Sequence, residues 1–277
     1  MSKKTAGLPA GVMEVRPPAR WLVALGRWGV LVLLLGLWEV GGRFGLIDRF
    51  YFSCPSEIVQ TAITKWNTGD LGRDIAYTAS STLLGFFLGT AVGTCIGLLF
   101  WFSRSAARIA DPWLIVINAL PKLALAPILV ILFGIGFSTK VVLAFLMTVV
   151  VAAMSASGGV ASVDPALTSL FYSLKAGRLK IFLHLVVPSA MRSVTTGLRV
   201  NIGLSMAGTI VGEFVASDRG LGRMIVYAGT TFDLKLVWVG VTVLSLLSLA
   251  MYLGVVGLEK LLDRIWAPAG RQQGTPS

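Results

Sequence analysis

The chain has 277 residues, of which 55% are hydrophobic and only 13% charged, and its mean hydropathy is +0.80. Water-soluble domains carry about 25% charged residues, so this composition excludes an ordinary soluble protein. A formal net charge of +11 could indicate nucleic-acid binding. Lys and Arg also accumulate in the cytoplasmic loops of membrane proteins, which explains the charge more simply. We therefore expect a membrane protein that does not bind nucleic acid.

The sequence lacks the residue patterns of common catalytic and metal sites. His184 is the only histidine, so a histidine metal cluster is impossible. Cys54 and Cys95 lie in a loop and in an apolar stretch, where we do not expect them to meet. No GxxxxGK[ST] phosphate loop occurs, so the chain cannot hydrolyse ATP through such a loop of its own. We expect no catalytic residue, metal or cofactor in this chain.

Six apolar stretches approach the roughly 20 residues that a helix needs to cross a bilayer. A basic cytoplasmic tail, residues 1–20, precedes the first span at 21–41. No small-residue cleavage pattern follows this span, so we interpret it as an uncleaved helix rather than a signal peptide. Residues 43–75 form an external segment, with a short helix opening at Pro55. The remaining five spans belong to a core at 77–260.

The second span, about Tyr77 to Phe102, carries a small residue at every fourth position. After Ser81 these residues are Gly85, Gly89, Gly93 and Gly97. Such a ladder lines one helix face with backbone and lets a neighbouring helix approach closely. We predict that this face packs against another helix.

Prolines and glycines mark the next two spans. The third span, about Pro112 to Phe133, is expected to start at Asp111-Pro112 and is interrupted by Pro121 and Pro127. Gly134, Ile135, Gly136 and Lys140 are expected to form a tight external turn. The fourth span follows at about Val141 to Ala161.

Two further spans complete the core. The fifth, about Thr195 to Ala216, contains several glycines and the charged residues Arg199 and Glu213. We expect the stretch from Ser217 to Lys235 to be an external loop, followed by the sixth span at about Leu236 to Leu258. Residues 261–277 are expected to form a cytoplasmic tail.

One stretch between the fourth and fifth spans, Asp164–Arg192, is amphipathic. Asp164 followed by Pro165 is a typical helix start, with an acidic cap and a proline at the first helical position. Two apolar stripes follow at helical spacing, separated at Ala176-Gly177, and the second ends at Pro188. The stripes comprise Leu167, Leu170, Phe171 and Leu174, and then Leu179, Phe182, Leu183, Val186 and Val187. We predict two short helices along a membrane face, either a docking element or an ordinary solvated connection.

The distribution of basic residues predicts the orientation. With the N-terminus inside, fourteen Lys and Arg residues fall on the cytoplasmic side and eight outside, while Lys122 and Arg199 fall within spans. Because Lys and Arg concentrate in cytoplasmic loops, we expect both termini and Asp164–Arg192 to lie in the cytoplasm.

Several residues inside the spans are candidates for lining a solute path. They are Asn118, Pro121, Lys122, Asn201, Ser205 and Glu213. Charged side chains inside a bilayer are costly and tend to face protein or water. Lys122 could form a cationic wall at the kink after Pro121, or reach the nearby cytoplasmic boundary instead. The two asparagines and Ser205 could equally bond a neighbouring helix, and Glu213 could act at a gate or simply end its span.

Segments typical of one protein family follow each other in order from about Trp38 to Trp266. They are Cys54–Val59, Leu84–Phe86 with the following glycines, Arg108–Pro112, Leu120–Pro127, Phe133–Gly136, Thr196–Arg199, Val211–Glu213 and Gly220–Gly222. On these segments the chain resembles the membrane subunits (permeases) of bacterial binding-protein-dependent ABC importers. It is most similar to the nitrate/sulfonate/taurine-type group.

The resemblance also covers the amphipathic segment, although less well. Permeases of this family carry a cytoplasmic Glu-Ala-Ala loop with a glycine four positions after the last alanine and a later Leu-Pro. Aligning the proline with Pro188 places Glu-Ala-Ala on Ser169-Leu170-Phe171 and the glycine on Lys175, with Gly177 two residues late. The motif is therefore degenerate, and the contacts of the family glutamate cannot be transferred to Ser169.

The resemblance implies an all-α membrane protein with six transmembrane helices, the type I ABC importer permease architecture and a cytoplasmic coupling helix. It implies a bacterial cytoplasmic (inner) membrane location, a second permease copy, two cytoplasmic ABC ATPase subunits that bind the ATP, and a periplasmic or lipid-anchored substrate-binding protein. The coupling residues would be Asp164, Pro165, Ser169, Leu170, Phe171, Leu174, Lys175, Gly177 and Pro188. Closure of the ATPase dimer would move this element and rock the helices between inward- and outward-facing states.

The expected cargo is a small anionic or zwitterionic solute, such as nitrate, taurine, an organosulfonate or bicarbonate. A thiamine-precursor pyrimidine is the alternative within the family. An ion-coupled carrier or a channel has no use for a docking loop, and the internal repeats common in carriers are not evident. A membrane-embedded enzyme would need a constellation of ionisable residues around one cavity, which the sequence does not show.

Overall fold

All regular structure in residues 20–266, the part of the chain that the computed structural model describes, is helical. Several side chains of the first helix, and those after Leu262, lie outside this description. The expected tails lie outside it at residues 1–19 and 267–277. The chain divides into two compact units, residues 1–56 and 57–277.

The first unit contains α1 (Arg20–Arg43) and α2 (Arg49–Phe52), and α3 (Pro55–Asn67) begins at its end. The Glu39 carboxylate near the end of α1 accepts hydrogen bonds from the Ser56 N–H at 3.0 Å and the Ser56 hydroxyl at 2.8 Å. It also accepts one from Arg43 Nε at 2.7 Å. Because Ser56 lies in the first turn of α3, Glu39 caps that helix from another helix. The predicted helix start at Pro55 is thus held by a side chain distant in sequence.

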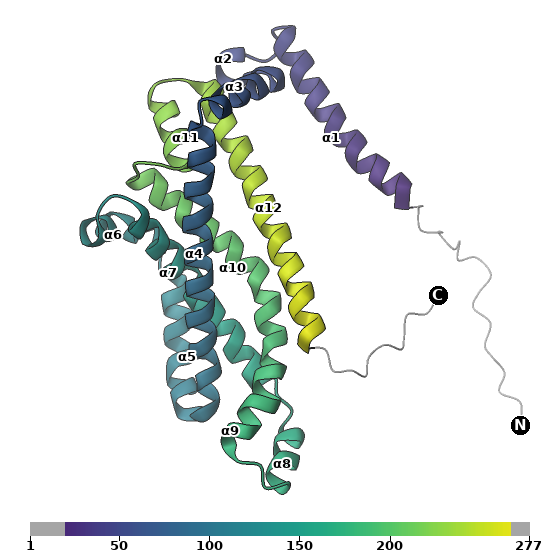
Figure 1. Cartoon of the computed structure of the whole chain (residues 1–277), viewed down its shortest axis with the longest axis vertical. Coiled ribbons are helices and arrows are strands. Elements are labelled where there is room, and N and C mark those ends of the chain that lie inside the picture. Colours follow the sequence, from purple (N-terminus) through teal and green to yellow (C-terminus); the bar gives the residue numbers. More distant parts are fainter. Residues whose placement is uncertain (1–19, 267–277) are drawn as a thin grey trace, which may run out of the picture. The chain divides into compact units, whose positions relative to one another are not determined.

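The second unit is built from long helices joined by short ones. The long helices are α4 (Asp70–Leu99), α7 (Phe137–Ala161), α10 (Val187–Val215) and α12 (Leu234–Trp266). The short ones are η1 (Phe100–Phe102), α5 (Arg104–Ala119), η2 (Lys122–Leu125), α6 (Ala126–Phe133), α8 (Pro165–Ser173), α9 (Arg178–Ile181), η3 (Phe182–Val186) and α11 (Leu221–Thr230). Figure 1 shows α8 and α9 at one end of this unit and α11 at the opposite end.

Helix α7 packs against both α4 and α10, which approach it through small residues. A Cβ added at Gly93 of α4 would lie 2.7 Å from the Cβ of Ala152 in α7. One added at Gly208 of α10 would lie 2.9 Å from the Cα of Ala144, also in α7, which is closer than real side chains come. All four ladder positions meet α7 in this way: Gly85, Gly89, Gly93 and Gly97. The helices are therefore in backbone contact, as small-residue faces allow in membrane proteins.

Four helical segments in the described residues are long and apolar enough to cross a membrane, or five if one bent pair counts as a span. They are Asp70–Phe102, Phe137–Ala161, Arg178–Val215 and Leu234–Leu262, and the bent pair is Arg104–Ala119 with Lys122–Phe133. These segments overlap the second to sixth predicted spans. The count rests on described residues only, and several side chains of α1, the predicted first span, lie outside them.

The third span differs from the prediction at both its start and its middle. α5 begins at Arg104, where the Ser103 hydroxyl accepts a hydrogen bond from Ala106 N at 3.2 Å, so the expected start at Pro112 is wrong. The chain then bends by 75° between α5 and the following helical pair. Leu120 is extended there, with φ −61° and ψ 138°, because a residue before proline disfavours the helical region. Pro121 thus breaks the span rather than merely kinking it.

The fifth span is longer than predicted. The second stripe of the amphipathic segment does not form a separate helix that stops at Pro188, because α9, η3 and α10 run on as one helical segment from Arg178 to Val215. A π-helical turn makes this possible: the Val187 N–H bonds the carbonyl of Phe182, five residues back. Pro188 lies directly after this turn, inside the continuous segment, so the helix passes through this proline instead of ending at it.

Three smaller expectations also change. Gly134 and Gly136 form the expected turn with φ of 78° and 140°, but Lys140 is buried inside α7 rather than in the turn. The stretch expected to be an external loop contains the helix α11. The predicted tail beginning at residue 261 is helical up to Trp266, because α12 continues that far.

Replacing Gly93 with Leu should destabilise the protein by at least about 1–3 kcal/mol, because the added side chain would force α4 away from α7. Thermal unfolding and folded yield in detergent would measure the effect. Gly254→Leu is a matched control, since nothing lies within 4 Å of a Cβ at that position in α12. Equal stability of the two variants would contradict the packing.

Candidate functional site

The segment expected to act as a coupling element, Asp164–Arg192, begins with a capped helix. The Asp164 carboxylate accepts a hydrogen bond from Ala166 N at 2.8 Å, and Pro165 occupies the first turn of α8. This is the predicted helix start, with the side chain and the proline in their predicted places. Ser169 is exposed in the middle of α8, where its hydroxyl bonds the carbonyl of Pro165 at 2.9 Å.

The end of α8 is held in a left-handed turn by a residue that is not glycine. Lys175 has φ +57°, its N–H bonds Tyr172 O at 2.9 Å, and Ala176 N bonds Phe171 O at 3.0 Å. Together these bonds form a Schellman motif, whose left-handed position is usually occupied by glycine. Gly177 has φ −68° and starts α9 instead. The left-handed position therefore falls on Lys175, the residue aligned with the glycine of the family pattern, and not on Gly177.

The first apolar stripe of this segment divides between two faces. Leu170 and Leu174 are 52% and 71% exposed. Phe171 packs inward against the buried cluster that contains Ile181 and Val186. Leu167 is 44% exposed as well, so one aromatic side chain seats α8 while the three leucines of the stripe stay outside.

The candidate path residues fall into three places. Asn118 and Pro121 are exposed around the break between α5 and α6, and Lys122 Nζ donates to Asn118 Oδ1 at 3.2 Å while its side chain is largely buried. Asn201 and Ser205 are buried on α10. They bond α4, as shown by Asn201 Nδ2 to Thr90 Oγ1 at 3.3 Å and Ser205 Oγ to Thr82 O at 2.7 Å. Within one chain, Asn201 and Ser205 thus form hydrogen bonds between α10 and α4, one of the two roles expected for them.

Glu213 lies at the third place, buried at the end of α10 that approaches α11. Its Oε1 accepts a hydrogen bond from Thr78 Oγ1 of α4 at 2.8 Å, and its Oε2 accepts one from Gly222 N at 2.7 Å. Thr78 Oγ1 in turn accepts from Leu221 N at 2.9 Å. Two of the first N–H groups of α11 are therefore capped by side chains from other helices, which satisfies groups that a helix leaves unbonded.

Two further side chains hold the turn before α11. Gly220 N donates to Asp74 Oδ1 of α4 at 2.9 Å. Lys140 Nζ donates to the Arg219 carbonyl at 3.0 Å and lies 3.8 Å from the centre of the Tyr77 ring. The buried lysine and glutamate are thus each tied to the backbone of the same short turn. We call the set Asp74, Thr78, Lys140 and Glu213, with the backbone of residues 219–222, the α11 clamp.

Sequence reasoning singled out Glu213 but missed its partners. Asp74 and Thr78 are one helical turn apart on α4, yet nothing in the sequence shows which helix they face. An ion pair between Arg199 Nε of α10 and Glu259 Oε2 of α12, 2.5 Å apart, was missed for the same reason. A signal did exist for Gly220 and Gly222, because two glycines around one residue favour close backbone approach.

Comparisons with known proteins identify the fold and the family. Residues 81–266 match the family described as binding-protein-dependent transport system inner membrane component. The chain belongs to this family. It is therefore a permease subunit of a binding-protein-dependent ABC importer, a multi-pass inner-membrane transport component that works with an ATPase and a substrate-binding protein.

Individual relatives cover nearly the whole permease. The taurine transport system permease protein TauC of Escherichia coli K12 is 28% identical over 239 residues, covering 84% of this chain and 87% of TauC. The formylaminopyrimidine transport permease protein ThiX of Halalkalibacterium halodurans is 29% identical over 236 residues, covering 83% and 92%. A chain of the MetNI methionine ABC transporter in an inward-facing conformation superposes with a TM-score of 0.62 at 14% identity, covering 73% of this permease and 98% of that chain. The predicted family and the predicted all-helical permease fold are confirmed.

The left-handed residue in the permease can be tested directly. Lys175→Gly should leave the free energy of unfolding unchanged or raise it by up to about 1 kcal/mol, because relief of left-handed strain offsets the entropy cost of glycine. Lys175→Val should lower it by more than about 1 kcal/mol, since a β-branched residue tolerates this conformation poorly. Thermal unfolding of the purified permease would rank the variants. Gly177→Ala should be neutral, and an equal loss of stability in Lys175→Val and Gly177→Ala would contradict the assignment.

Proposed function

We propose that two copies of this permease enclose a path through the inner membrane for a small anionic or zwitterionic solute. Two ATPase subunits dock at the α8 end, and a periplasmic or lipid-anchored binding protein delivers the solute at the α11 end. Both termini lie in the cytoplasm, as the excess of Lys and Arg on that side favours. The family match over residues 81–266 is the observation that carries this proposal.

The proposed cargo is a sulfonate such as taurine, or a comparably small anion such as nitrate or bicarbonate. The similarity to TauC, at 28% identity over most of both chains, supports this choice. A thiamine-precursor pyrimidine is the second candidate, supported by the 29% identity to ThiX. Transport competition between a sulfonate and the pyrimidine decides between these candidates.

The coupling element is proposed to be α8 with its two flanking turns. Its exposed leucines, Leu170 and Leu174, lie on a helix capped at both ends and seated by Phe171. Burying a leucine in a socket of the ATPase would contribute roughly 1.5–3 kcal/mol. The chain has no phosphate loop, so the energy of ATP hydrolysis is proposed to enter through this contact.

Reconstitution into liposomes with the cognate ATPase and binding protein should give ATP-dependent uptake of labelled taurine or a related sulfonate. Excess unlabelled sulfonate should abolish this uptake, and formylaminopyrimidine should not. The permease purified alone should show no ATP hydrolysis, because it lacks a phosphate loop. Competition by the pyrimidine alone would favour the second candidate, and hydrolysis by the isolated permease would contradict the subunit assignment.

The Leu170→Ala/Leu174→Ala variant should weaken ATPase attachment about tenfold or more, or uncouple hydrolysis from uptake, because about 1.5–3 kcal/mol is lost per leucine. Phe171 is kept, since its truncation would disturb the inner packing instead. Co-purification of the ATPase and the ratio of solute imported to ATP hydrolysed are the measurements. Leu249→Ala, a comparably exposed leucine on α12, serves as the control. Normal attachment and coupling in the double variant would refute this docking role.

A further inference from the structure

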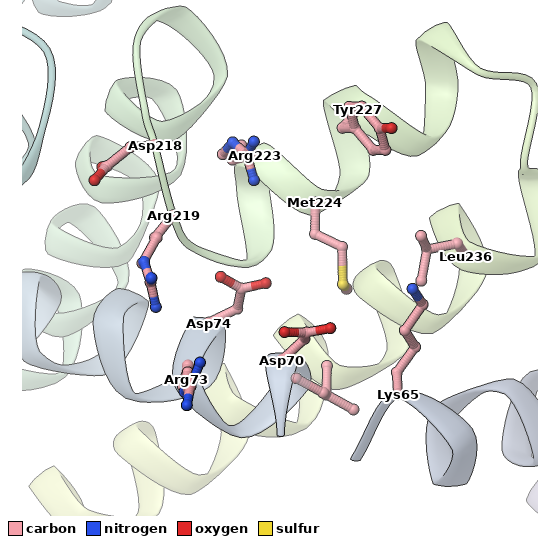
Figure 2. A pocket seen from close by; sticks show the side chains of 11 residues that line it. Lys65, Asp70, Arg73, Asp74, Asp218, Arg219, Arg223, Met224, Tyr227 and Leu236 are labelled. Atoms are coloured by element: carbon pink, nitrogen blue, oxygen red, sulfur yellow. The ribbon is translucent and has the colours of Figure 1, made fainter. Parts of the chain in front are cut away.

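A cavity of about 350 Å³ opens beside the α11 clamp, at the end of the permease opposite α8. Figure 2 shows Arg73 and Asp74 on α4, and Arg219 with Arg223 on the turn and first part of α11, around this cavity. Lys65 of α3 completes the basic lining. With Leu236 of α12, side chains from four helices and a turn therefore face one recess.

The acidic groups around the recess are already engaged within the permease. Asp74 accepts from Gly220 N, and Asp218 accepts from the Tyr77 hydroxyl at 3.3 Å. Asp70 accepts from the Thr68 hydroxyl at 3.2 Å. These carboxylates are thus held in place by the fold, and two of them fasten the turn before α11.

Unlike these carboxylates, the three arginines of the recess have no charged partner among the described residues. Arg73, Arg219 and Arg223 are exposed, and in the part of the chain that the structure describes none of them takes part in an ion pair. Arg223 lies 6.0 Å from the centre of the Tyr227 ring. Each guanidinium can bind a carboxylate through two parallel hydrogen bonds. Among the described residues, the recess thus presents three guanidinium groups without an ion pair, beside carboxylates that accept hydrogen bonds within the permease.

The clamp makes this surface rigid. The N–H groups of Gly220, Leu221 and Gly222 are bonded by side chains of α4 and α10. On the other side, Met224 and Ala228 of α11 are buried. The backbone that carries Arg219 and Arg223 is therefore fixed relative to the α4 backbone that carries Arg73, so no ordering of the turn is needed when a partner binds.

We propose that Arg73, Arg219 and Arg223 form the electrostatic docking site for a carboxylate-bearing face of the substrate-binding protein. This inference rests on the proposed function and on its orientation, which places α11 outside. A protein surface suits the recess better than a small free anion, because the anion would meet carboxylates as well as arginines. A protein can instead set acidic groups on the arginines and neutral or basic groups near the aspartates.

The test compares charge reversals in the complete importer, reconstituted in nanodiscs of zwitterionic lipid. Arg73→Glu/Arg219→Glu/Arg223→Glu should weaken binding of the purified binding protein about tenfold or more and remove most of its salt dependence. The milder triple change to Gln should weaken binding less, and it serves if the Glu variant folds poorly. Arg104→Glu/Arg108→Glu, at exposed positions on α5, is the control and should leave the affinity unchanged.

Reversal of acidic residues on the binding protein should restore affinity for the Glu variant, which a merely structural role of the arginines would not allow. Unchanged affinity in the Glu and Gln variants would refute the docking site. Reduced uptake with normal affinity would also refute it and point to a free anion at the recess. An effect seen only in anionic nanodiscs would refute it in favour of a lipid headgroup. If the wild-type importer does not bind the substrate-binding protein at all, both the docking site and the proposed function are refuted.

Discussion

The close approach of α4 and α10 to α7 through small residues is the constraint on which the rest of this permease depends. At Gly93 and Gly208 there is no room for a single additional carbon atom. Backbones held this close let very short side chains reach across between helices. Ser205 bonds the Thr82 carbonyl, and Thr148 lies 3.4 Å from the carbonyl of Gly85. Neither bond could form between helices separated by ordinary leucine packing.

The same closeness explains how charged groups are tolerated inside the unit. Glu213 and Lys140 are both buried, which is costly for a charged side chain unless it is well bonded. Lys140 finds a backbone partner in the turn before α11 and Glu213 finds one in the first turn of α11, because α4, α7 and α10 converge there. The polar groups therefore do not interrupt the packing. They connect a short helix to it.

The features that depend on local sequence were predictable. The length of the apolar stretches predicted the second to sixth spans. The spacing of four predicted the packed glycine face of α4, and Asp164-Pro165 predicted the start of α8. The departures arise where a partner distant in sequence decides. Lys140 looked like a turn residue because its acceptor, the Arg219 carbonyl, is far away along the chain. Pro188 looked like a helix end because a π-helical turn cannot be read from apolar spacing.

The candidate site shows the same division. The degenerate coupling motif could be aligned from Pro188, but only the backbone shows that Lys175, aligned with the family glycine, adopts a left-handed conformation. Asn201 stays a predicted path residue, because polar side chains in spans are often functional. Its bond to Thr90 depends on which face α10 turns toward α4, and hydropathy does not contain that information.

The continuous helical segment from Arg178 to Val215 has a mechanical consequence. A helix of this length extends about 57 Å, enough to reach from one side of a membrane to the other. Its irregular turn, η3, lies close to the α8 end. A tilt of about 5° at that turn would carry Val215 sideways by roughly 4 Å, because about 43 Å of regular helix lies beyond it. A small change of angle beside α8 would therefore be converted into a displacement of several ångströms at the end of the segment near α11.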